Sequence, residues 1–393
     1  MTSSSQLGLA KGYTFTIFTM TSIVISFFPL YFDAVGYSKL QIGMLYAIGP
    51  MIGIVSNLLW GYISDRWGTI RKVLLLLTGQ LIMAPLVFHA ESFGLLYAAM
   101  AVFFFFQQPM LSMNDSQLLL ITSVSGKSYA SFRVYGSIGF AFASLVFGMI
   151  LKETGHTFTA YLAYGSVIAS LLFAFLLRDV RGGKDSFKPI EWKPMAKIIG
   201  SRPFLRFLGL LLILSIAHRI NDGFLALYMR ELHAPDSLIG YAWTASALSE
   251  IPTFFLLSKY GHKFKELALL AVAASVYMIR FTLLSFIQDP VWAIALQAMH
   301  SMSFGIFLFT GIRYVSQAVP DEYRASGQAI FAVTWQSVAG LISGVIGGWL
   351  FEAYGGQWLY RIAALLALAA AVGFFVTHWY EENGSPRKQL RKY

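Results

Sequence analysis

Long apolar runs separated by short polar connections make up most of the chain. A membrane-spanning helix needs about 20 mostly apolar residues, whereas a spanning β-strand needs about 10 residues of alternating character. The runs here are long and do not alternate, and Gly or Pro interrupts several of them, which membrane helices tolerate. The pattern predicts twelve transmembrane helices, at 12–34, 40–64, 73–91, 92–120, 132–152, 158–178, 205–231, 237–258, 266–287, 290–316, 326–352 and 357–380.

The longest polar connection divides these helices into six and six. It runs from Asp179 to Ser201 and contains RGGKDSFKPIEWKPMAK. We therefore expect an all-α polytopic membrane protein with two pseudo-symmetric six-helix halves, at 1–178 and 205–381. Residues 179–204 would form a cytoplasmic linker and residues 382–393 a cytoplasmic tail.

Two short motifs recur at corresponding places in the two halves. LYFDAVGYSKLQIG at 30–43 and LYMRELHAPDSLIG at 227–240 share Leu-Tyr and Ile-Gly at the same spacing. RVYG at 133–136 opens the fifth predicted helix, and RASG at 324–327 opens the eleventh. The repeats indicate a duplicated six-helix unit, an architecture in which a substrate binds near mid-membrane between two moving halves.

Composition supports a membrane protein. Of the 393 residues, 57% are hydrophobic and 12% are charged, against about 25% charged residues in ordinary globular proteins. Too few polar residues exist to cover soluble domains, and the same composition excludes a disordered chain. The absence of cysteine excludes disulfides and thiolate metal sites.

The net charge of +10 reflects where the basic residues lie along the chain. Four of them lie on the side of the membrane away from the termini, namely Lys39, Lys152, Arg230 and Arg361. Three more, Arg133, Arg219 and Arg280, fall within or at the edge of spans. The other 22 of the 29 lie on the side that holds both termini. Because cytoplasmic loops are rich in Lys and Arg, we expect cytoplasmic termini and a multi-pass protein of the cell (inner or plasma) membrane. No nucleic-acid partner is then needed to explain the charge.

A sharper motif, GYISDRWGTIRK at 61–72, connects the second and third predicted helices. Asp65 ends a helix beside several cations, so it can form an ion pair in one conformation and release it in another. An ordinary basic loop would explain the cations but not the spacing of Gly61, Asp65 and Gly68. The motif resembles the signature loop of the major facilitator superfamily. We define the gate motif as Gly61, Asp65, Arg66, Gly68, Arg71 and Lys72.

Further motifs between residues 15 and 375 resemble the subgroup of this superfamily that contains lactose permease, nucleoside–proton symporters and phenylpropionate-type permeases. They are FPLY at 28–31, LQIG at 40–43, FRVYGSIGF at 132–140, SEIP at 249–252 and QAMHSMSFG at 297–305. The resemblance implies the major facilitator fold and a small organic solute as substrate. Arg280 precedes His300 by 20 residues, as an Arg precedes a His in lactose permease.

One departure from lactose permease concerns proton coupling. The carboxylate that exchanges the proton there, three residues beyond the His, corresponds to Ser303 here. Two positions that are Lys there correspond to Gln297 and Gln336. Proton symport would therefore require a different acid.

Ionisable residues within the predicted helices are candidates for function, because a charge at the bilayer centre costs about 2.5–3.5 kcal/mol. Glu250 has no cation within one turn of its own helix, and we expect it to be the proton-coupling acid, ahead of Asp115 and Asp222. His218 and Asp222 are four residues apart and share a helix face. Arg219 beside them is either a structural partner of Asp222 or a substrate contact.

Polar and aromatic residues near the predicted centre are candidates for the substrate cavity. Arg133 and Arg280 would suit a carboxylate on the substrate, or they are neutralised by Asp115 and Glu250. His300 is either a substrate contact or a hydrogen-bonded packing residue. The full set of cavity candidates is Tyr31, Asn114, Arg133, Tyr135, His218, Arg219, Tyr228, Trp243, Arg280, His300 and Trp335.

Glycine recurs at every fourth residue of the eleventh predicted helix, at Gly340, Gly344 and Gly348. A stripe of small residues at this spacing lets two membrane helices approach closely. We expect it to serve helix packing.

No enzyme is indicated. The chain has no GxxxxGK[ST] loop for ATP, and its seven histidines lack metal-ligand spacing, so we expect no cofactor and no metal. The favoured function is a secondary active transporter that moves a sugar, a nucleoside or an aromatic acid by alternating access with proton symport. The alternative is a proton-antiport exporter or flippase of drugs or lipids. A non-transporting membrane sensor would need a soluble domain to relay its signal. We expect a functional monomer whose partners are its substrate, protons and the bilayer.

Overall fold

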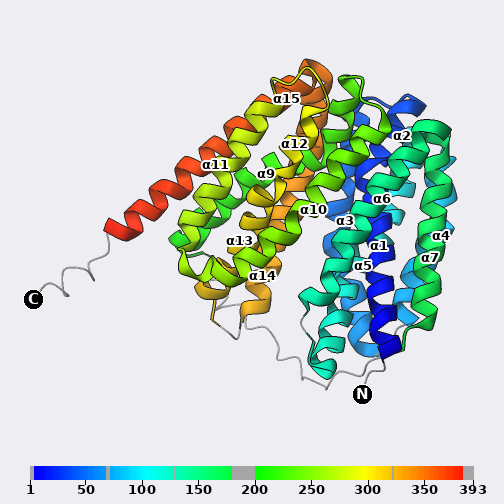
Figure 1. Cartoon of the computed structure of the whole chain (residues 1–393), viewed down its shortest axis with the longest axis horizontal. Coiled ribbons are helices and arrows are strands. Elements are labelled where there is room, and N and C mark those ends of the chain that lie inside the picture. The colour runs from blue at the N-terminus through cyan, green and yellow to red at the C-terminus, as the bar shows by residue number, and fades with distance from the viewer. Residues whose placement is uncertain (1–3, 68–70, 128, 179–199, 321–322, 384–393) are drawn as a thin grey trace, which may run out of the picture.

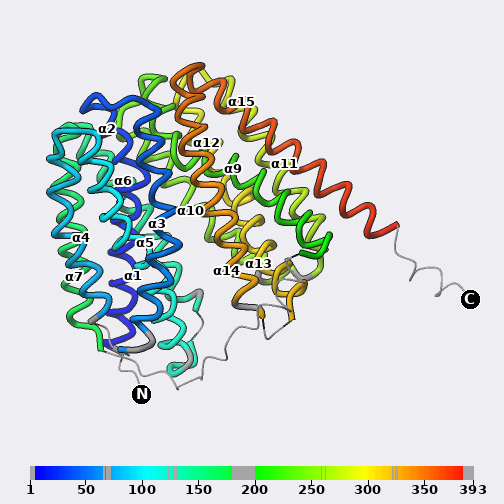
Figure 2. Tube along the Cα trace, turned by 180° about the vertical axis from the view of Figure 1, so that it is seen from behind, coloured from blue at the N-terminus to red at the C-terminus, as the bar shows by residue number. Residues whose placement is uncertain are grey.

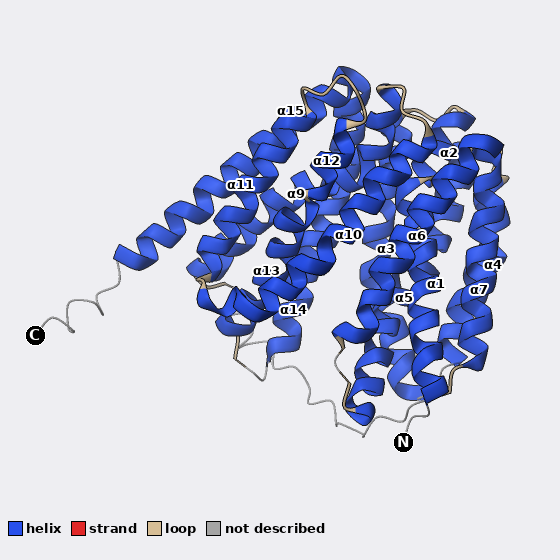
Figure 3. Cartoon of the chain, in the orientation of Figure 1, coloured by secondary structure: helices blue, strands red, loops and turns tan. Residues whose placement is uncertain are grey.

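The computed structural model describes residues 4–67, 71–127, 129–178, 200–320 and 323–383, and every regular element in these ranges is a helix (Figures 1 and 3). The expected linker 179–204 and tail 382–393 fall mostly outside these ranges, so the domain boundaries stay predictions. The first half comprises α1 (Ser4–Ser26), α2 (Phe28–Val35), α3 (Lys39–Trp67), α4 (Arg71–Phe88), α5 (Phe93–Ser125), α6 (Ala130–Thr154), η1 (His156–Phe158) and α7 (Thr159–Leu176).

The second half repeats this order of helices. It comprises α9 (Arg202–Glu231), α10 (Asp236–Tyr260), η2 (Gly261–Lys263), α11 (Glu266–Leu284), α12 (Trp292–Ala298), η3 (Ser301–Gly305), α13 (Ile306–Ala318), α14 (Arg324–Ala332), η5 (Val333–Val338) and α15 (Ala339–Asn383).

Each predicted span coincides with one helix or with consecutive pieces of one. Pro29 in the first turn of α2 separates α2 from α1, because Pro has no N–H to continue the preceding helix. Gly355, with φ +81°, divides α15 into the last two spans. Nine segments of the described ranges meet the length and hydropathy of a span, and one of them, Ser326–Asn383, contains two spans. With α4 and α10 the total is twelve, so the predicted fold class is confirmed.

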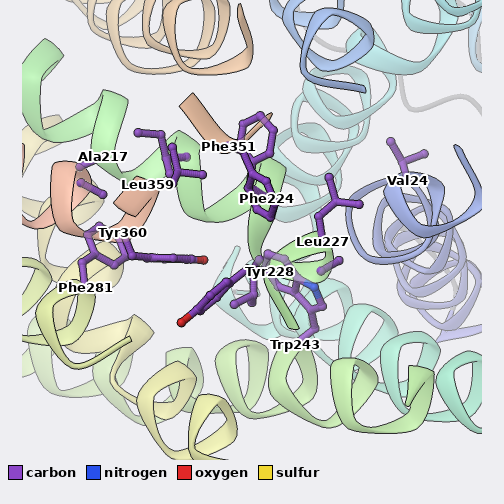
Figure 4. Close-up of a cluster of buried hydrophobic side chains, with 14 of the residues drawn as sticks. Val24, Ala217, Phe224, Leu227, Tyr228, Trp243, Phe281, Phe351, Leu359 and Tyr360 are labelled. Atoms are coloured by element: carbon purple, nitrogen blue, oxygen red, sulfur yellow. The ribbon is translucent and has the colours of Figure 1, made fainter. Parts of the chain in front are cut away.

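One apolar core extends across both halves. Val24 on α1 belongs to the same buried cluster as Leu227 and Tyr228 on α9 and Trp243 on α10 (Figure 4). A smaller buried cluster, around Phe132, lies within the first half. The shared core holds the two bundles together, because burial of apolar side chains between them is favourable.

The two halves meet most closely at two helix pairs, α3 with α15 and α6 with α10. A Cβ atom at Gly43 would lie 2.1 Å from the carbonyl oxygen of Gly344, and a Cβ atom at Gly240 would lie 2.2 Å from that of Ser144. We call the end of the bundle that contains these contacts the sealed end. Toward the other end, where the N-terminus lies, the helices of the two halves diverge (Figures 1 and 2).

The glycine stripe of the eleventh span forms one of these contacts. A Cβ atom at Gly344 would lie 2.6 Å from the carbonyl oxygen of Gly43, and one at Gly348 would lie 2.9 Å from that of Lys39. A Cβ atom at Gly340 would clash with the Pro50 ring. The expectation that the stripe serves helix packing is therefore confirmed.

Candidate substrate and proton-coupling site

A polar network in the second half surrounds the guanidinium of Arg280, which is completely buried on α11. Its Nη1 lies 3.2 Å from His300 Nδ1 and donates to Ser303 Oγ at 3.3 Å. Its Nη2 donates to Asn221 Oδ1 at 3.3 Å and to the side-chain oxygen of Gln297. Among the described residues no carboxylate forms an ion pair with Arg280, so neutral acceptors hold its charge.

Arg280 fixes the position of the proton on neutral His300. A guanidinium only donates hydrogen bonds, so His300 Nδ1 accepts and the ring proton lies on Nε2. That Nε2 is 3.5 Å from Oε1 of Glu250, which extends from α10. The Glu250 side chain is 19% exposed, whereas that of His300 is 7% exposed. Glu250 is therefore the accessible end of a chain that runs through His300 to Arg280.

A second chain of polar contacts follows α9 beside the first. The Tyr277 hydroxyl lies 3.0 Å from His218 Nδ1, and His218 Nε2 lies 3.3 Å from Asp222 Oδ2. Arg219 Nη1 donates to the same carboxylate oxygen at 3.2 Å. Asp222 thus has two partners on its own helix, His218 four residues before it and Arg219 three residues before it.

Asn221 connects four helical segments. Its Oδ1 accepts from Arg280, from Gln297 Nε2 at 3.0 Å and from the Tyr360 hydroxyl at 3.2 Å. One oxygen therefore joins α9, α11, α12 and α15. This shared acceptor couples the four segments, since loss of the Asn221 oxygen would leave several buried donors with one partner fewer.

The candidate residues of the first half form separate contacts. Asp115 accepts from the Tyr129 hydroxyl at 2.8 Å, and Asn114 is buried against Thr14 at 3.0 Å. Arg133 lies over the Phe18 ring at 4.2 Å. Lys11 lies over the Tyr135 ring at 4.9 Å. No contact between these residues and the Arg280 network is found in the described part of the chain.

Two aromatic candidates, Tyr31 and Trp243, lie apart from the network, whereas Tyr228 packs against its member Tyr360 with ring centroids 4.9 Å apart. The Tyr31 hydroxyl donates to the Phe88 carbonyl at 2.8 Å, beside Phe32. The buried Tyr228 donates to the Leu284 carbonyl at 2.7 Å. Trp243 is buried against Phe140 of the other half, with ring centroids 6.1 Å apart (Figure 4). By contrast, Trp335 lies at the edge of the network, 6.2 Å from His218 between ring centroids.

The gate motif lies where α3 ends at Trp67 and α4 begins at Arg71. Gly68 and the side chains of Asp65, Arg66 and Arg71 are outside the described part of the chain. Gly61 has open space where a side chain would start, and Lys72 is buried. The role of the motif stays a prediction.

Several members of the network were not predicted from the sequence. Asn221, Tyr277 and Tyr360 were not among the candidates, and Gln297 and Ser303 were noted only as departures from lactose permease. Polar residues in the middle of apolar helices were the available signal. Tyr277 and Tyr360 gave none, because aromatic residues are common throughout these spans.

Comparison with known proteins agrees with this architecture. Residues 9–362 match the MFS_1 like family. The Escherichia coli (strain K12) protein named "Probable 3-phenylpropionic acid transporter" is 25% identical over 92% of this chain and 95% of its own length. The maltose permease of Geobacillus stearothermophilus is 25% identical over 80% of each chain. The crystal structure of the nucleoside transporter NupG superposes with a TM-score of 0.79 at 17% identity, over 95% of this chain and 99% of NupG. The chain belongs to the MFS_1 like family of major facilitator superfamily transporters.

Proposed function

We propose that this protein carries a sugar, a nucleoside or an aromatic acid across the membrane by alternating access, coupled to proton symport. The names of its relatives, a maltose permease and a phenylpropionic acid transporter, support a small organic solute, as does its similarity to a nucleoside transporter. The observation that carries the coupling proposal is the contact between Glu250 and His300, with Arg280 behind it.

The charges of the network explain how a proton would favour substrate binding. The network holds two guanidiniums, on Arg219 and Arg280, and two carboxylates, on Asp222 and Glu250. It is neutral while Glu250 is ionised and gains one positive charge when Glu250 binds a proton. An uncompensated charge in a membrane interior is costly, so a protonated network favours a substrate group that accepts hydrogen bonds or carries negative charge. The proton would therefore bind before the substrate.

His300 makes Glu250 the member that changes its protonation. Because Arg280 donates to Nδ1, His300 presents its Nε2 proton to Glu250. Asp222 is held between His218 and Arg219, whereas His300 is the single partner of Glu250 among the described residues. Glu250 also keeps the exposure that proton exchange with water requires.

Alternating access is supported by the arrangement of the halves. The basic residues favour a cytoplasmic location for the N-terminal end, so the sealed end would face outward and this conformation would be inward-facing. Separation of the Gly43 and Gly240 contacts would then open the outward path, and the gate motif would close the cytoplasmic one. We further propose a functional monomer in the cell membrane.

The test uses the purified protein in lipid vesicles under an imposed proton gradient, with uridine, 3-phenylpropionate and maltose as solutes. Glu250→Gln keeps the shape of the protonated side chain. We expect it to abolish uphill accumulation while exchange between equal pools continues. The control is Glu153→Gln, because that carboxylate is 74% exposed and contacts only its neighbour Lys152 among the described residues. If Glu250→Gln still accumulates solute uphill, Glu250 is not the coupling acid and the proton binds at Asp115 or Asp222.

A further inference from the structure

Two π-helical turns lie side by side in the second half. They are η3 (Ser301–Gly305) and η5 (Val333–Val338), and they meet through Phe304 and Trp335, whose ring centroids are 5.8 Å apart. A π-turn inserts one residue into a helix, which rotates the side chains after it, and such turns occur frequently at functional sites. Here each turn carries one aromatic ring, Phe304 in η3 and Trp335 in η5, and the two rings are in contact.

The two rings differ from their aromatic neighbours in exposure. Phe307, Phe331 and His218 are all buried, at 0%, 2% and 2% exposure. Phe304 and Trp335 are only half-buried. A cluster that served packing alone would bury its largest rings, so the partial exposure of Phe304 and Trp335 needs an explanation.

The η5 turn that carries Trp335 lies between the two halves of the protein. The η5 turn contacts both α9 and α3, and α3 belongs to the first half. Trp335 therefore belongs to a turn that packs against both bundles. Phe304 is joined to it and to His218 on α9, with which it stacks at 4.5 Å and 12°. An alternating-access carrier binds its substrate between its two halves, which is where this turn lies.

Phe304 also lies next to both chains of polar contacts. It stacks on His218 and, at 5.1 Å and 28°, on His300. Through these rings it adjoins Asp222 in one chain and Glu250 in the other. A flat ligand lying on Phe304 and Trp335 would therefore have its edge close to the group proposed to bind the proton.

We propose that Phe304 and Trp335 form an aromatic subsite that selects a solute with a planar aromatic ring and a polar substituent. The inference rests on the proposed function and narrows its substrate from three classes to two, aromatic acids and nucleosides. Stacking explains the selection, because the faces of Phe and Trp attract another π-system in offset or edge-on geometry. The polar substituent then reaches the hydrogen-bonding groups around Glu250 and Arg219.

The first test changes the ligand and leaves the protein intact. Binding to the full-length purified protein is measured by calorimetry for two matched pairs, 3-phenylpropionate with 3-cyclohexylpropionate, and uridine with dihydrouridine. Each pair differs chiefly in the planarity of its ring. We expect the planar member of at least one pair to bind about tenfold more tightly, as stacking contributions allow. Equal affinities within both pairs, or binding of maltose alone, would overturn the subsite.

The second test changes the rings. Phe304→Leu and Trp335→Leu should each raise the Kd of the planar ligand by roughly tenfold, whereas Phe304→Tyr and Trp335→Phe should keep it within about threefold. Matched controls are Phe375→Leu and Trp349→Leu, because these rings on α15 are 61% and 51% exposed and lie outside the cluster. A ligand affinity that the leucine variants leave unchanged contradicts the subsite.

The two proposals fail in different ways. If maltose alone is accumulated uphill and Glu250→Gln abolishes this, the carrier is a symporter without an aromatic subsite. If planar ligands bind and depend on Phe304 and Trp335 but no proton moves with them, the subsite stands and coupled symport is wrong.

Discussion

Gly240 on α10 contacts the backbone of Ser144 on α6 so closely that a Cβ atom at Gly240 would lie 2.2 Å from the Ser144 carbonyl oxygen. Gly43 on α3 has the equivalent relationship with Gly344 on α15, at 2.1 Å. Gly43 and Gly240 are the last residues of the repeated motif at 30–43 and 227–240. The repeat thus marks two places where the halves touch at the sealed end.

Alanine at either glycine should weaken the sealed end. We expect Gly43→Ala and Gly240→Ala to disfavour this conformation by about 1–3 kcal/mol, since the methyl group cannot fit against a backbone atom. The chain has no cysteine, so Ser237→Cys, a buried position beside Gly148, provides a single label. Maleimide should react with it roughly tenfold faster in either alanine variant.

The control for this experiment is Gly165→Ala, because a Cβ atom at Gly165 has nothing within 4 Å. If Gly43→Ala and Gly240→Ala both leave the labelling rate at the wild-type value, the glycine contacts do not control access of maleimide to the sealed end.

The repeat shows what a single sequence can reveal about this fold. Hydrophobic run length was sufficient for all twelve spans, because the bilayer imposes one length on every helix. The stripe Gly340, Gly344 and Gly348 also had a local signature, and its packing role is confirmed. The two π-turns were not predictable, because an inserted residue leaves no mark in a hydrophobic pattern.

The polar network was only partly predictable for a physical reason. His218, Arg219 and Asp222 lie within one helical turn, so their spacing alone indicated contact. Glu250 looked solitary because its partner His300 is 50 positions away on another helix. Contacts of that kind depend on how helices pack, which the sequence of one helix does not contain.

A hydrogen bond from one half to a carboxylate of the other should stabilise the sealed end more weakly than the glycine contacts do. Glu352 on α15 accepts a hydrogen bond at 2.8 Å from the backbone N–H of Leu40, in the first turn of α3. A carboxylate at a helix N-terminus contributes about 0.3–1 kcal/mol. Glu352→Gln should therefore raise the Ser237→Cys labelling rate only about two- to fivefold. A rate equal to that of the glycine variants would mean that the carboxylate has a larger role than an end cap.

Arg280→Lys should impair transport although it keeps the charge. An ammonium group cannot reproduce the planar fork of donors, so acceptors such as Asn221 and Gln297 lose a partner. We expect a lower thermal unfolding temperature and at least about tenfold slower uphill uptake. The control is Arg206→Lys, whose side chain is exposed on α9. Normal uptake by Arg280→Lys would show that the network needs only a positive charge.

The gate motif predicts that substitution of Asp65 impairs transport without impairing folding. Asp65→Asn should lower transport in vesicles, because the neutral amide cannot form the ion pair that the motif implies, while expression and the elution profile stay near normal. Asp289→Asn in an exposed loop is the matched control. Unchanged transport by Asp65→Asn would remove the gate role.

Membrane orientation can be measured with two single cysteines. The substitutions are Ser186→Cys, at a position in the expected cytoplasmic linker, and His156→Cys, at a position in η1 at the sealed end. In intact cells an impermeant maleimide should react only with the cysteine at position 156. Reaction of the cysteine at position 186 from outside would reverse the topology.

The glycine contacts also determine how easily the sealed end can open. The carbonyl groups of Ser144 and Gly344 lie inside helices, where they accept the ordinary bonds of their own chain. Separation of the halves there breaks backbone van der Waals contact, breaks polar contacts such as that of Thr244 with the Ala141 carbonyl, and exposes part of the apolar core that the halves share. The barrier to exchange between conformations therefore includes polar contacts across this end, such as that of Glu352 with Leu40, besides the shared apolar core. Natural variation at these few positions would change the transport rate without altering the binding site.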